Sequence, residues 1–113
     1  MNLSAKKNEQ FPLAVGGSRG MKFFHVNEII RLEGDRNYTN FIFTGKRSYL
    51  SSKTLKEYEE ILSDKGFVRI HKSHLVNSAF VQSVSNDGIM YLSDLTQLEI
   101  SRRRLPEVKG FFP

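Results

Sequence analysis

The sequence feature that most constrains the fold is a succession of short aromatic and β-branched runs separated by turn residues. The clearest run is Tyr38 to Phe43, which places Thr39, Phe41 and Phe43 on one side and the alternate residues on the other. Alternation of this kind is typical of a strand that buries one face. Asn86-Asp87-Gly88 separates two further runs and is a strong hairpin signal. These patterns predict a mainly β fold.

The remaining runs place strands along most of the chain. The first two flank the stretch 16–20, and we expect them to pair as a hairpin because its glycines permit the positive φ that turns need. The chain has 9 Phe and 4 Tyr, and aromatic residues are enriched in strands. In chain order, the expected strands cover 11–15, 21–25, 27–33, 38–43, 47–51, 67–70, 80–84, 89–92 and 98–101.

One amphipathic helix is predicted between Thr54 and about Leu62. Its apolar residues recur at helical spacing and form one stripe, made of Leu55, Tyr58, Ile61 and Leu62. Thr54 and Glu57 match a capping box, although a preceding serine is an alternative N-cap, and Gly66 is placed to end the helix. The outer face is net acidic, so we expect this helix to pack on a sheet and to lie away from phosphate.

A second helical segment is predicted within 102–112, with Pro106 limiting its start and Gly110 its end. The composition is that of one globular domain, with 113 residues, 39% hydrophobic and 26% charged. The absence of Cys excludes disulfides and thiolate metal sites. No apolar run approaches the roughly 20 residues of a membrane span. We therefore expect a cytoplasmic domain at 11–113, preceded by a polar linker at 1–10.

The segment from Phe67 to Asn77 changes from strand-like alternation to a polar group and back. Its first part predicts a strand from which Arg69 points outward. The polar group His71–His74 follows, and Leu75-Val76 then returns the chain to the interior. Because both ends are anchored by apolar residues, the polar projection should be rigid, and a rigid segment loses less entropy on binding. This arrangement indicates a recognition segment.

Catalytic and metal-binding interpretations of this segment fail on the residues that surround it. His71 and His74 have a spacing that suits one helical face, but zinc needs further ligands, and the segment contains no Asp or Glu. His25 is the only other histidine. Ser73 lacks both a paired acid and the Gly-x-Ser-x-Gly turn that would activate it. We therefore predict no enzyme, no metal site and no cofactor.

Three basic clusters lie where predicted strands meet turns, at Arg36-Asn37-Tyr38, His71-Lys72-Ser73 and Arg102-Arg103-Arg104. Arg and Lys suit guanine or phosphate, and Asn suits adenine, so each cluster combines groups that can contact nucleic acid. The net charge of +5 agrees with such a partner without requiring one. Two other interpretations remain open: solvated strand ends with an incidental charge excess, or a protein-interaction module that uses strand edges and the acidic helix.

The segment Phe67-Val-Arg-Ile-His-Lys-Ser-His-Leu-Val-Asn77, followed by Ile100-Ser-Arg-Arg103, resembles the signature of the LytTR DNA-binding domain family. That signature runs approximately Phe-x-Arg-x-His-Arg/Lys-Ser-x-x-Val-Asn, then a hairpin, then Val-Ser-Arg-Arg. Upstream, Ile29 to Tyr38 resembles the strand and first loop of the family, and Thr54 to Glu57 resembles the start of its helix. These motifs occur in the order and spacing of the family over about residues 11–112.

The resemblance implies an elongated fold of about ten short strands in small stacked antiparallel sheets, with one or two short helices. It also implies sequence-specific binding of double-stranded DNA through loops that enter successive major grooves, with two copies on repeated half-sites. Such domains usually form the C-terminal output half of bacterial two-component response regulators that control transcription. We therefore expect an upstream receiver domain to be missing from this chain, with a free-standing LytTR regulator as the alternative.

The resemblance also assigns roles to individual residues. Base contacts fall on Asn37 or its neighbour Arg36, on Lys72 and on Arg102. Phosphate contacts fall on Arg36, Tyr38, Arg103 and Arg104, while His71 and Ser73 orient the second loop or contact the DNA backbone, and Asn77 is structural. Two features depart from the family pattern: His74 stands where an aromatic residue is more common, and the variable length of the first loop leaves the choice between Arg36 and Asn37 open.

Overall fold

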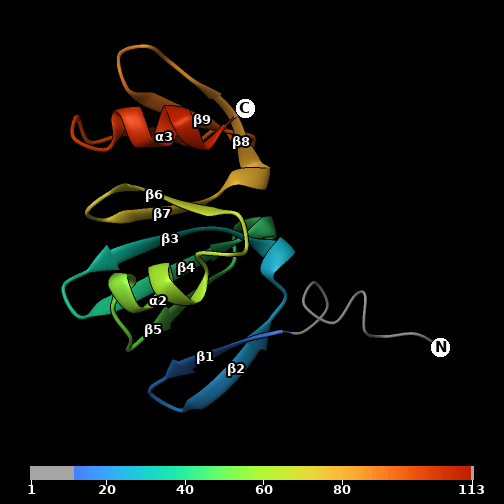
Figure 1. Cartoon of the computed structure of the whole chain (residues 1–113). Helices are drawn as coiled ribbons and strands as arrows, with labels where there is room; N and C mark the ends of the chain where they lie inside the picture. The colour runs from blue at the N-terminus through green and yellow to red at the C-terminus, as the bar shows by residue number, and fades with distance from the viewer. Residues whose placement is uncertain (1–11, 113) are drawn as a thin grey trace.

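The computed structural model describes residues 12–112, which form ten strands in three antiparallel sheets (Figure 1). The predicted linker at 1–10 lies outside the described residues. Small stacked sheets with two short helices confirm the predicted fold class. The strands are β1 Leu13–Gly17, β2 Gly20–Phe24, β3 Ile29–Asp35, β4 Tyr38–Phe43, β5 Ser48–Ser51, β6 Phe67–His71, β7 His74–Asn77, β8 Val81–Val84, β9 Ile89–Leu92 and β10 Gln97–Glu99, and the α-helices are α2 Leu55–Ile61 and α3 Leu105–Phe111.

A five-stranded sheet of order β5-β4-β3-β7-β6 forms the centre of the domain. Its middle strand places Leu32 opposite both Phe41 of β4 and Leu75 of β7, and all three side chains are buried on one face. Helix α2 covers this face, as Figure 1 shows. The first hydrophobic core therefore lies between this sheet, α2 and the β1–β2 hairpin, with Leu13, Val15, Ile29, Leu32, Phe41, Phe43, Leu55, Tyr58, Leu62, Phe67 and Leu75 buried.

A second core lies on the other face of the same sheet, beneath the three-stranded sheet β10-β9-β8 and helix α3. Its buried residues are Ile30, Val68, Ile70, Val76, Met90, Leu92, Leu98, Ile100 and Val108. Strands β6 and β7 serve both cores, because alternate side chains of a strand point to opposite faces. Phe67 and Leu75 belong to the first core, whereas Val68 and Val76 belong to the second. The turn between β6 and β7 is thus anchored from both sides.

The predicted hairpin of the first two runs is confirmed as the β1–β2 pair, which forms its own two-stranded sheet. Its inner face contributes Leu13 and Val15 to the first core. The amide of Ser52 donates to the carbonyl of Gly16 at 3.2 Å and joins the hairpin to the end of β5. The outer face carries Met21 and Phe23, which are both more than half exposed.

Helix α2 begins with the predicted capping box. The side chain of Thr54 accepts from the amide of Glu57, and the Glu57 carboxylate accepts from the amide of Thr54 at 2.7 Å. The carboxylate also accepts from the Thr54 hydroxyl at 3.1 Å, and its bonds from the Thr54 amide and hydroxyl lower the pKa of Glu57. The helix ends at Ile61, within one residue of the predicted end. Two details of the prediction are wrong: Ile61 of the predicted apolar stripe is 39% exposed, and Gly66 does not end the helix. The intervening residues form turns, and Gly66, at φ 84°, leads the chain into β6.

The C-terminal segment differs from the prediction at two points. Strand β10 ends at Glu99: the amide of Ile100 still donates to Gly88, next to the start of β9, but the amide of Ser101 donates to Ile70 of the central sheet. Helix α3 has Pro106 in its first turn, as predicted, but continues through Gly110 to Phe111. The ring of Phe112 packs against the second core. This packing stabilises the helix beyond Gly110. Within residues 12–112, neither helix is long and apolar enough to cross a membrane.

Candidate nucleic-acid interface

The first basic turn joins β3 to β4 and consists of Arg36 and Asn37. Arg36 is exposed and adopts a φ of 60°, in the left-handed region that non-glycine residues rarely occupy. Asn37 is also exposed, and Tyr38 follows with 52% of its surface exposed. A short turn at the end of two long paired strands therefore presents a cation, an amide and a phenol to solvent.

The second basic turn, Lys72 and Ser73, joins β6 to β7. Lys72 is exposed, whereas its neighbours His71 and Ser73 are half-buried. The ring Nδ1 of His71 accepts a hydrogen bond from the backbone N–H of Ser73 at 3.1 Å. Because the Nδ1 lone pair of His71 accepts from the Ser73 amide, it does not accept from the Ser73 hydroxyl. His71 and Ser73 therefore do not form a base and nucleophile through this nitrogen. His71 and Ser73 instead hold the turn that projects Lys72.

The third basic segment, Arg102 to Arg104, connects β10 to α3. Arg102 and Arg103 are exposed, and Arg104 is half-buried as the N-cap residue of α3. The segment is folded into a turn by the amide of Arg104, which donates to the carbonyl of Ser101 at 3.0 Å. Two adjacent guanidinium groups are therefore presented from a short turn with a defined backbone.

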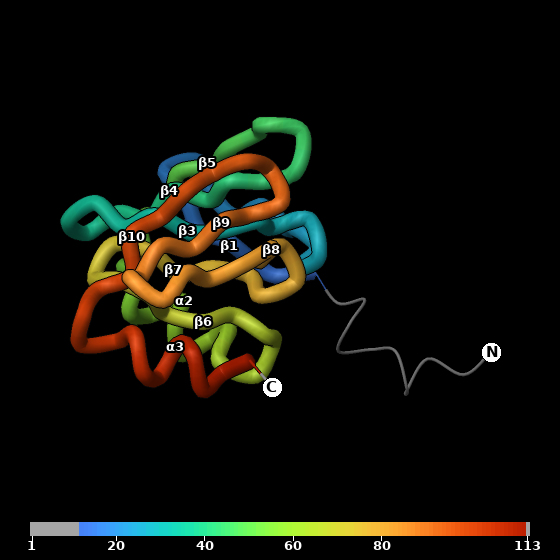
Figure 2. Tube along the Cα trace, turned by 90° about the horizontal axis from the view of Figure 1, so that it is seen from above, coloured from blue at the N-terminus to red at the C-terminus, as the bar shows by residue number. Residues whose placement is uncertain are grey.

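Two backbone hydrogen bonds join the strand ends that carry these three segments. The amide of Gly34 donates to the carbonyl of Ser73 at 2.9 Å, which ties the first turn to the second. The amide of Ser101 donates to the carbonyl of Ile70 at 2.9 Å, which ties the third segment to the end of β6. All three lie on the left side of Figure 1 and again on the left of Figure 2, seen from above. We call residues 36–38, 71–73 and 102–104 the basic edge.

An open depression of about 340 Å³ lies between the first two turns and the start of α2. Arg36, Lys72 and Ser73 line it together with Lys56. Gly34 lets the first turn approach the helix, because a Cβ added there would lie 3.1 Å from the Cβ of Leu55. Lys56 was not among the predicted site residues, since the acidic outer face of α2 led us to place this helix away from phosphate. Only tertiary packing brings its first turn to the basic edge.

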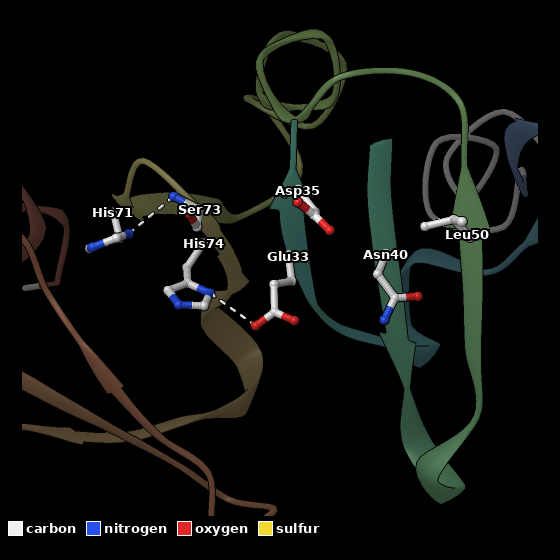
Figure 3. A pocket seen from close by; sticks show the side chains of 8 residues that line it. Glu33, Asp35, Asn40, Leu50, His71, Ser73 and His74 are labelled. Atoms are coloured by element: carbon white, nitrogen blue, oxygen red, sulfur yellow. Dashed lines mark hydrogen bonds and ion pairs between the residues drawn. The ribbon is translucent and has the colours of Figure 1, made fainter. Parts of the chain in front are cut away.

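A second hollow, of about 600 Å³, lies beside the second turn and has a different character. Figure 3 shows Glu33, Asp35 and Asn40 of the central sheet facing His71 and His74 across it. Nδ1 of His74 lies 3.9 Å from the Glu33 carboxylate and has no hydrogen-bond partner. The two carboxylates disfavour phosphate here, so this hollow limits the basic edge on one side.

Burial lowers the pKa of His74, and the charge of Arg31 and the neighbouring His71 act in the same direction. The Glu33 carboxylate opposes this effect without overcoming it. His74 is therefore neutral in the folded protein at pH values near 7. Its ring lies 5.3 Å from that of His71, measured between centroids. Among residues 12–112, no three His, Asp or Glu side chains are grouped so that they could hold a metal ion.

Arg69 contradicts its predicted outward orientation, because its side chain is only 11% exposed. Alternation along β6 holds at Arg69, which shares with Phe67 the face that α2 covers; the side chain is buried because both faces of β6 are covered. The guanidinium group turns back onto the carbonyls of the second turn and onto Glu59 of α2. Sequence alternation gave no signal for this arrangement.

Asn77 has the predicted structural role. It is 5% exposed, and its side-chain amide donates to the carbonyl of Ile29 at 2.9 Å and accepts from the amide of Ala79 at 3.0 Å. It thereby satisfies buried backbone groups where β7 ends.

The fold defines a class of small antiparallel β domains, and here its strand ends present three basic segments at one edge. The sequence model of the LytTr DNA-binding domain family matches residues 19–112, and the chain belongs to this family. It is thus a domain that binds double-stranded DNA in transcription regulation.

Two curated relatives from Paraburkholderia xenovorans (strain LB400) are the heme-containing CO-sensing transcriptional regulators RcoM 2 and RcoM 1. Each is 32% identical to this chain over 89 residues, which cover 74% of this chain and 33% of the relative. The match therefore spans about a third of the length of these regulators.

A solved LytTr DNA-binding domain from Bacillus cereus, part of a protein described as a methyl-accepting/DNA response regulator, has the same fold. The TM-score is 0.76 at 15% identity, and the alignment covers 90% of this chain and 96% of the other. At this identity the likeness concerns the fold alone.

Proposed function

We propose that the basic edge is the surface that reads DNA sequence, with Asn37 or Arg36, Lys72 and Arg102 contacting base edges in the major groove. In this proposal Tyr38, Arg103 and Arg104 contact phosphates, and Arg36 does so where Asn37 is the base reader. His71 and Ser73 orient the second turn. The three turns enter successive grooves of a bent duplex.

The observation that carries the proposal is the mutual bonding of the three basic segments. They come from distant parts of the sequence, yet the bonds from Gly34 to Ser73 and from Ser101 to Ile70 place them side by side. A surface held in one geometry can match a fixed spacing of base edges, whereas three independent loops would each lose entropy on binding. Such rigidity supports sequence reading in addition to charge attraction.

The exposure of the side chains supports the division of roles. Lys72 and Arg102 are exposed and have long side chains, so they can reach into a groove. His71 and Ser73 are half-buried and already bonded to each other, which suits residues that orient the turn. Phosphate contacts fix register, and base contacts supply specificity.

At the level of the whole protein, we propose the output domain of a two-component response regulator in the bacterial cytoplasm, with the receiver domain upstream. Two copies would bind two repeated half-sites. A single domain contacts few base pairs. When two copies are held together, binding of the first to one half-site raises the effective concentration of the second at the other half-site. A free-standing regulator remains the alternative for the chain as a whole.

Selection of bound duplexes from a randomised DNA pool tests the proposed function. We expect an enriched motif that occurs twice at fixed spacing, and an affinity for it that falls steeply with salt because counterions are released from the phosphates. Weak, salt-sensitive binding without enrichment would contradict sequence reading. An affinity for a protein partner that is independent of salt and of Arg102 would support the interaction-module alternative.

A further inference from the structure

The second turn of the basic edge is held from behind by one side chain, that of Arg69. Its Nε donates to the carbonyl of His71 at 2.7 Å, and its Nη2 donates to the carbonyl of Lys72 at 2.6 Å. Its Nη1 donates to the Glu59 carboxylate at 2.6 Å. The Arg69 side chain is 11% exposed, whereas Glu59 is 37% exposed. One guanidinium group therefore connects helix α2 with two successive peptide groups of the turn.

This arrangement uses a property that lysine lacks. The guanidinium group is planar and carries five N–H donors in a fixed fork, so its contacts determine one another's direction. Fixing the carbonyls of His71 and Lys72 fixes the peptide planes on both sides of the Lys72 Cα atom. The direction in which the Lys72 side chain leaves the turn is then set before DNA arrives.

Glu59 determines where the guanidinium group can lie. It projects from α2, whose residues Leu55 and Tyr58 are buried in the first core. The ion pair between Arg69 and Glu59 therefore anchors the second turn to helix α2 and, through it, to the first core. Charge-assisted hydrogen bonds of this length are roughly twice as strong as neutral ones. All three guanidinium nitrogens of Arg69 are bonded within the protein, although the side chain also lines the depression beside Arg36 and Lys72.

We infer that Arg69, oriented by Glu59, is a positioning residue that presets the second turn for base reading and so contributes to DNA specificity more than to overall attraction. This inference rests on the proposed role of Lys72 at the basic edge. Attraction to phosphate needs only charge near the DNA, whereas a base contact needs a donor in one place. We call the three hydrogen bonds of Arg69, to His71, Lys72 and Glu59, the clamp. Loss of the clamp should therefore reduce the preference of the protein for the selected duplex and leave its non-specific DNA binding unchanged.

The test compares Arg69→Lys with the wild type in two measurements on the whole chain. Arg69→Lys keeps the charge and removes the fork, so we expect about a tenfold loss of affinity for the selected duplex, equivalent to one base contact. Affinity for a random duplex and its salt dependence should stay the same. Without DNA, hydrogen exchange at the amides of Ser73 and Gly34 should become faster, because both donate within or to the second turn.

Glu59→Gln is a second variant, in which the change of charge and the loss of the clamp act on DNA binding in opposite directions. It raises the net charge by one, which favours DNA binding in general, yet it weakens the hold on Arg69. We expect its preference for the selected over the random duplex to fall. Arg31→Lys is the matched control, because Arg31 is also largely buried and paired with a carboxylate, that of Glu33, but makes no hydrogen bond to the turn.

Each outcome decides between the clamp and the proposed function. A wild-type protein without preference for any duplex would overturn the proposed function and the contribution to specificity, while exchange would still report on the clamp. A retained preference in both variants, or unchanged exchange at Ser73 and Gly34, would overturn the clamp alone. An equal loss of preference in Arg31→Lys would mean that any disturbance of the central sheet has this effect, which also contradicts the inference.

Discussion

The basic edge can be compared with the edge of the domain on the opposite side, which we call the far edge and which consists of residues 44–47 and 93–96. Figure 2 shows these two turns side by side at upper right, and together they line one groove. Both edges carry exposed cations, and both have residues with positive φ, Arg36 at 60° on one and Lys46 at 63° on the other. Backbone strain therefore does not distinguish the two edges, although the basic edge carries five Lys and Arg residues and the far edge two, beside Asp94.

The two edges differ in how their turns are held. On the basic edge, backbone bonds run from one turn to the next. On the far edge, each turn closes on itself, through the amide of Phe43 to Arg47 and the amide of Leu92 to Thr96. Arg47 lies near Glu28 and over the ring of Phe43. In the proposed function, a cluster of cations reads DNA sequence only where the backbones that carry it are fixed relative to one another.

Paired alanine substitutions should show the largest difference in DNA affinity between the two edges. Replacing Lys72 and Arg102 with Ala should cost roughly 1–3 kcal/mol for each residue on the selected duplex, concentrated at the base pair that each one reads. The matched control replaces Lys46 and Arg47, which removes the same charge from the far edge. The control should weaken binding to all duplexes slightly and equally. Equal losses from both pairs, measured by titration at fixed salt, would show that binding follows net charge alone.

Asn77 lies at the end of β7 remote from the basic edge, so its replacement should separate stability from recognition. Asn77→Ala leaves the carbonyl of Ile29 and the amide of Ala79 without their partner. We expect a loss of roughly 1–3 kcal/mol in the free energy of unfolding, measured with denaturant. At temperatures where the variant is folded, its preference for the selected duplex should match that of the wild type, and a lost preference would contradict the separation.

Arg36→Gly and Lys46→Gly form a matched pair, because both remove one cation and relieve one left-handed residue. Relief of strain and the added freedom of glycine nearly cancel, so each free energy of unfolding should stay within about 1 kcal/mol of the wild type. Only Arg36→Gly should reduce the salt slope of DNA binding, by about one. A similar change in slope for Lys46→Gly would place DNA on the far edge as well.

The pH dependence of stability should report on the hollow beside the second turn. The folded pKa of His74 is lowered, so below its ordinary pKa the unfolded chain binds a proton that the folded chain excludes. The contribution of neutral His74 to the free energy of unfolding is therefore fully present above the pKa of the unfolded chain. It is lost as the pH falls from there toward the lowered pKa of the folded chain. His74→Gln should flatten this dependence, measured by denaturant unfolding at several pH values. Identical slopes in the wild type and His74→Gln would contradict the effect.

Local features of this domain could be predicted well from the sequence. The capping box of Thr54 and Glu57 spans four residues, and the alternation from Tyr38 to Phe43 is complete within one strand. The three basic segments could also be found, because each lies next to a strand end whose pattern is clear. In these cases the determining contacts are close together in the chain.

Contacts between distant segments could not be predicted. Arg69 is predicted to face solvent, because alternation gives no sign that helix α2, with Glu59, covers this face of β6. Gly110 was expected to end α3, but packing of Phe112 on the second core extends the helix. Lys56 reaches the basic edge only because Gly34 allows α2 to approach the first turn. Tertiary packing decides each of these features.

The most direct test of the basic edge is an amide NMR titration of the wild-type chain with the selected duplex. We expect the largest shift changes at residues 36–38, 71–73 and 102–104, with residues 44–47 and 93–96 unaffected. Changes of similar size on both edges, or changes confined to the far edge, would contradict the assignment of the basic edge as the surface that reads DNA.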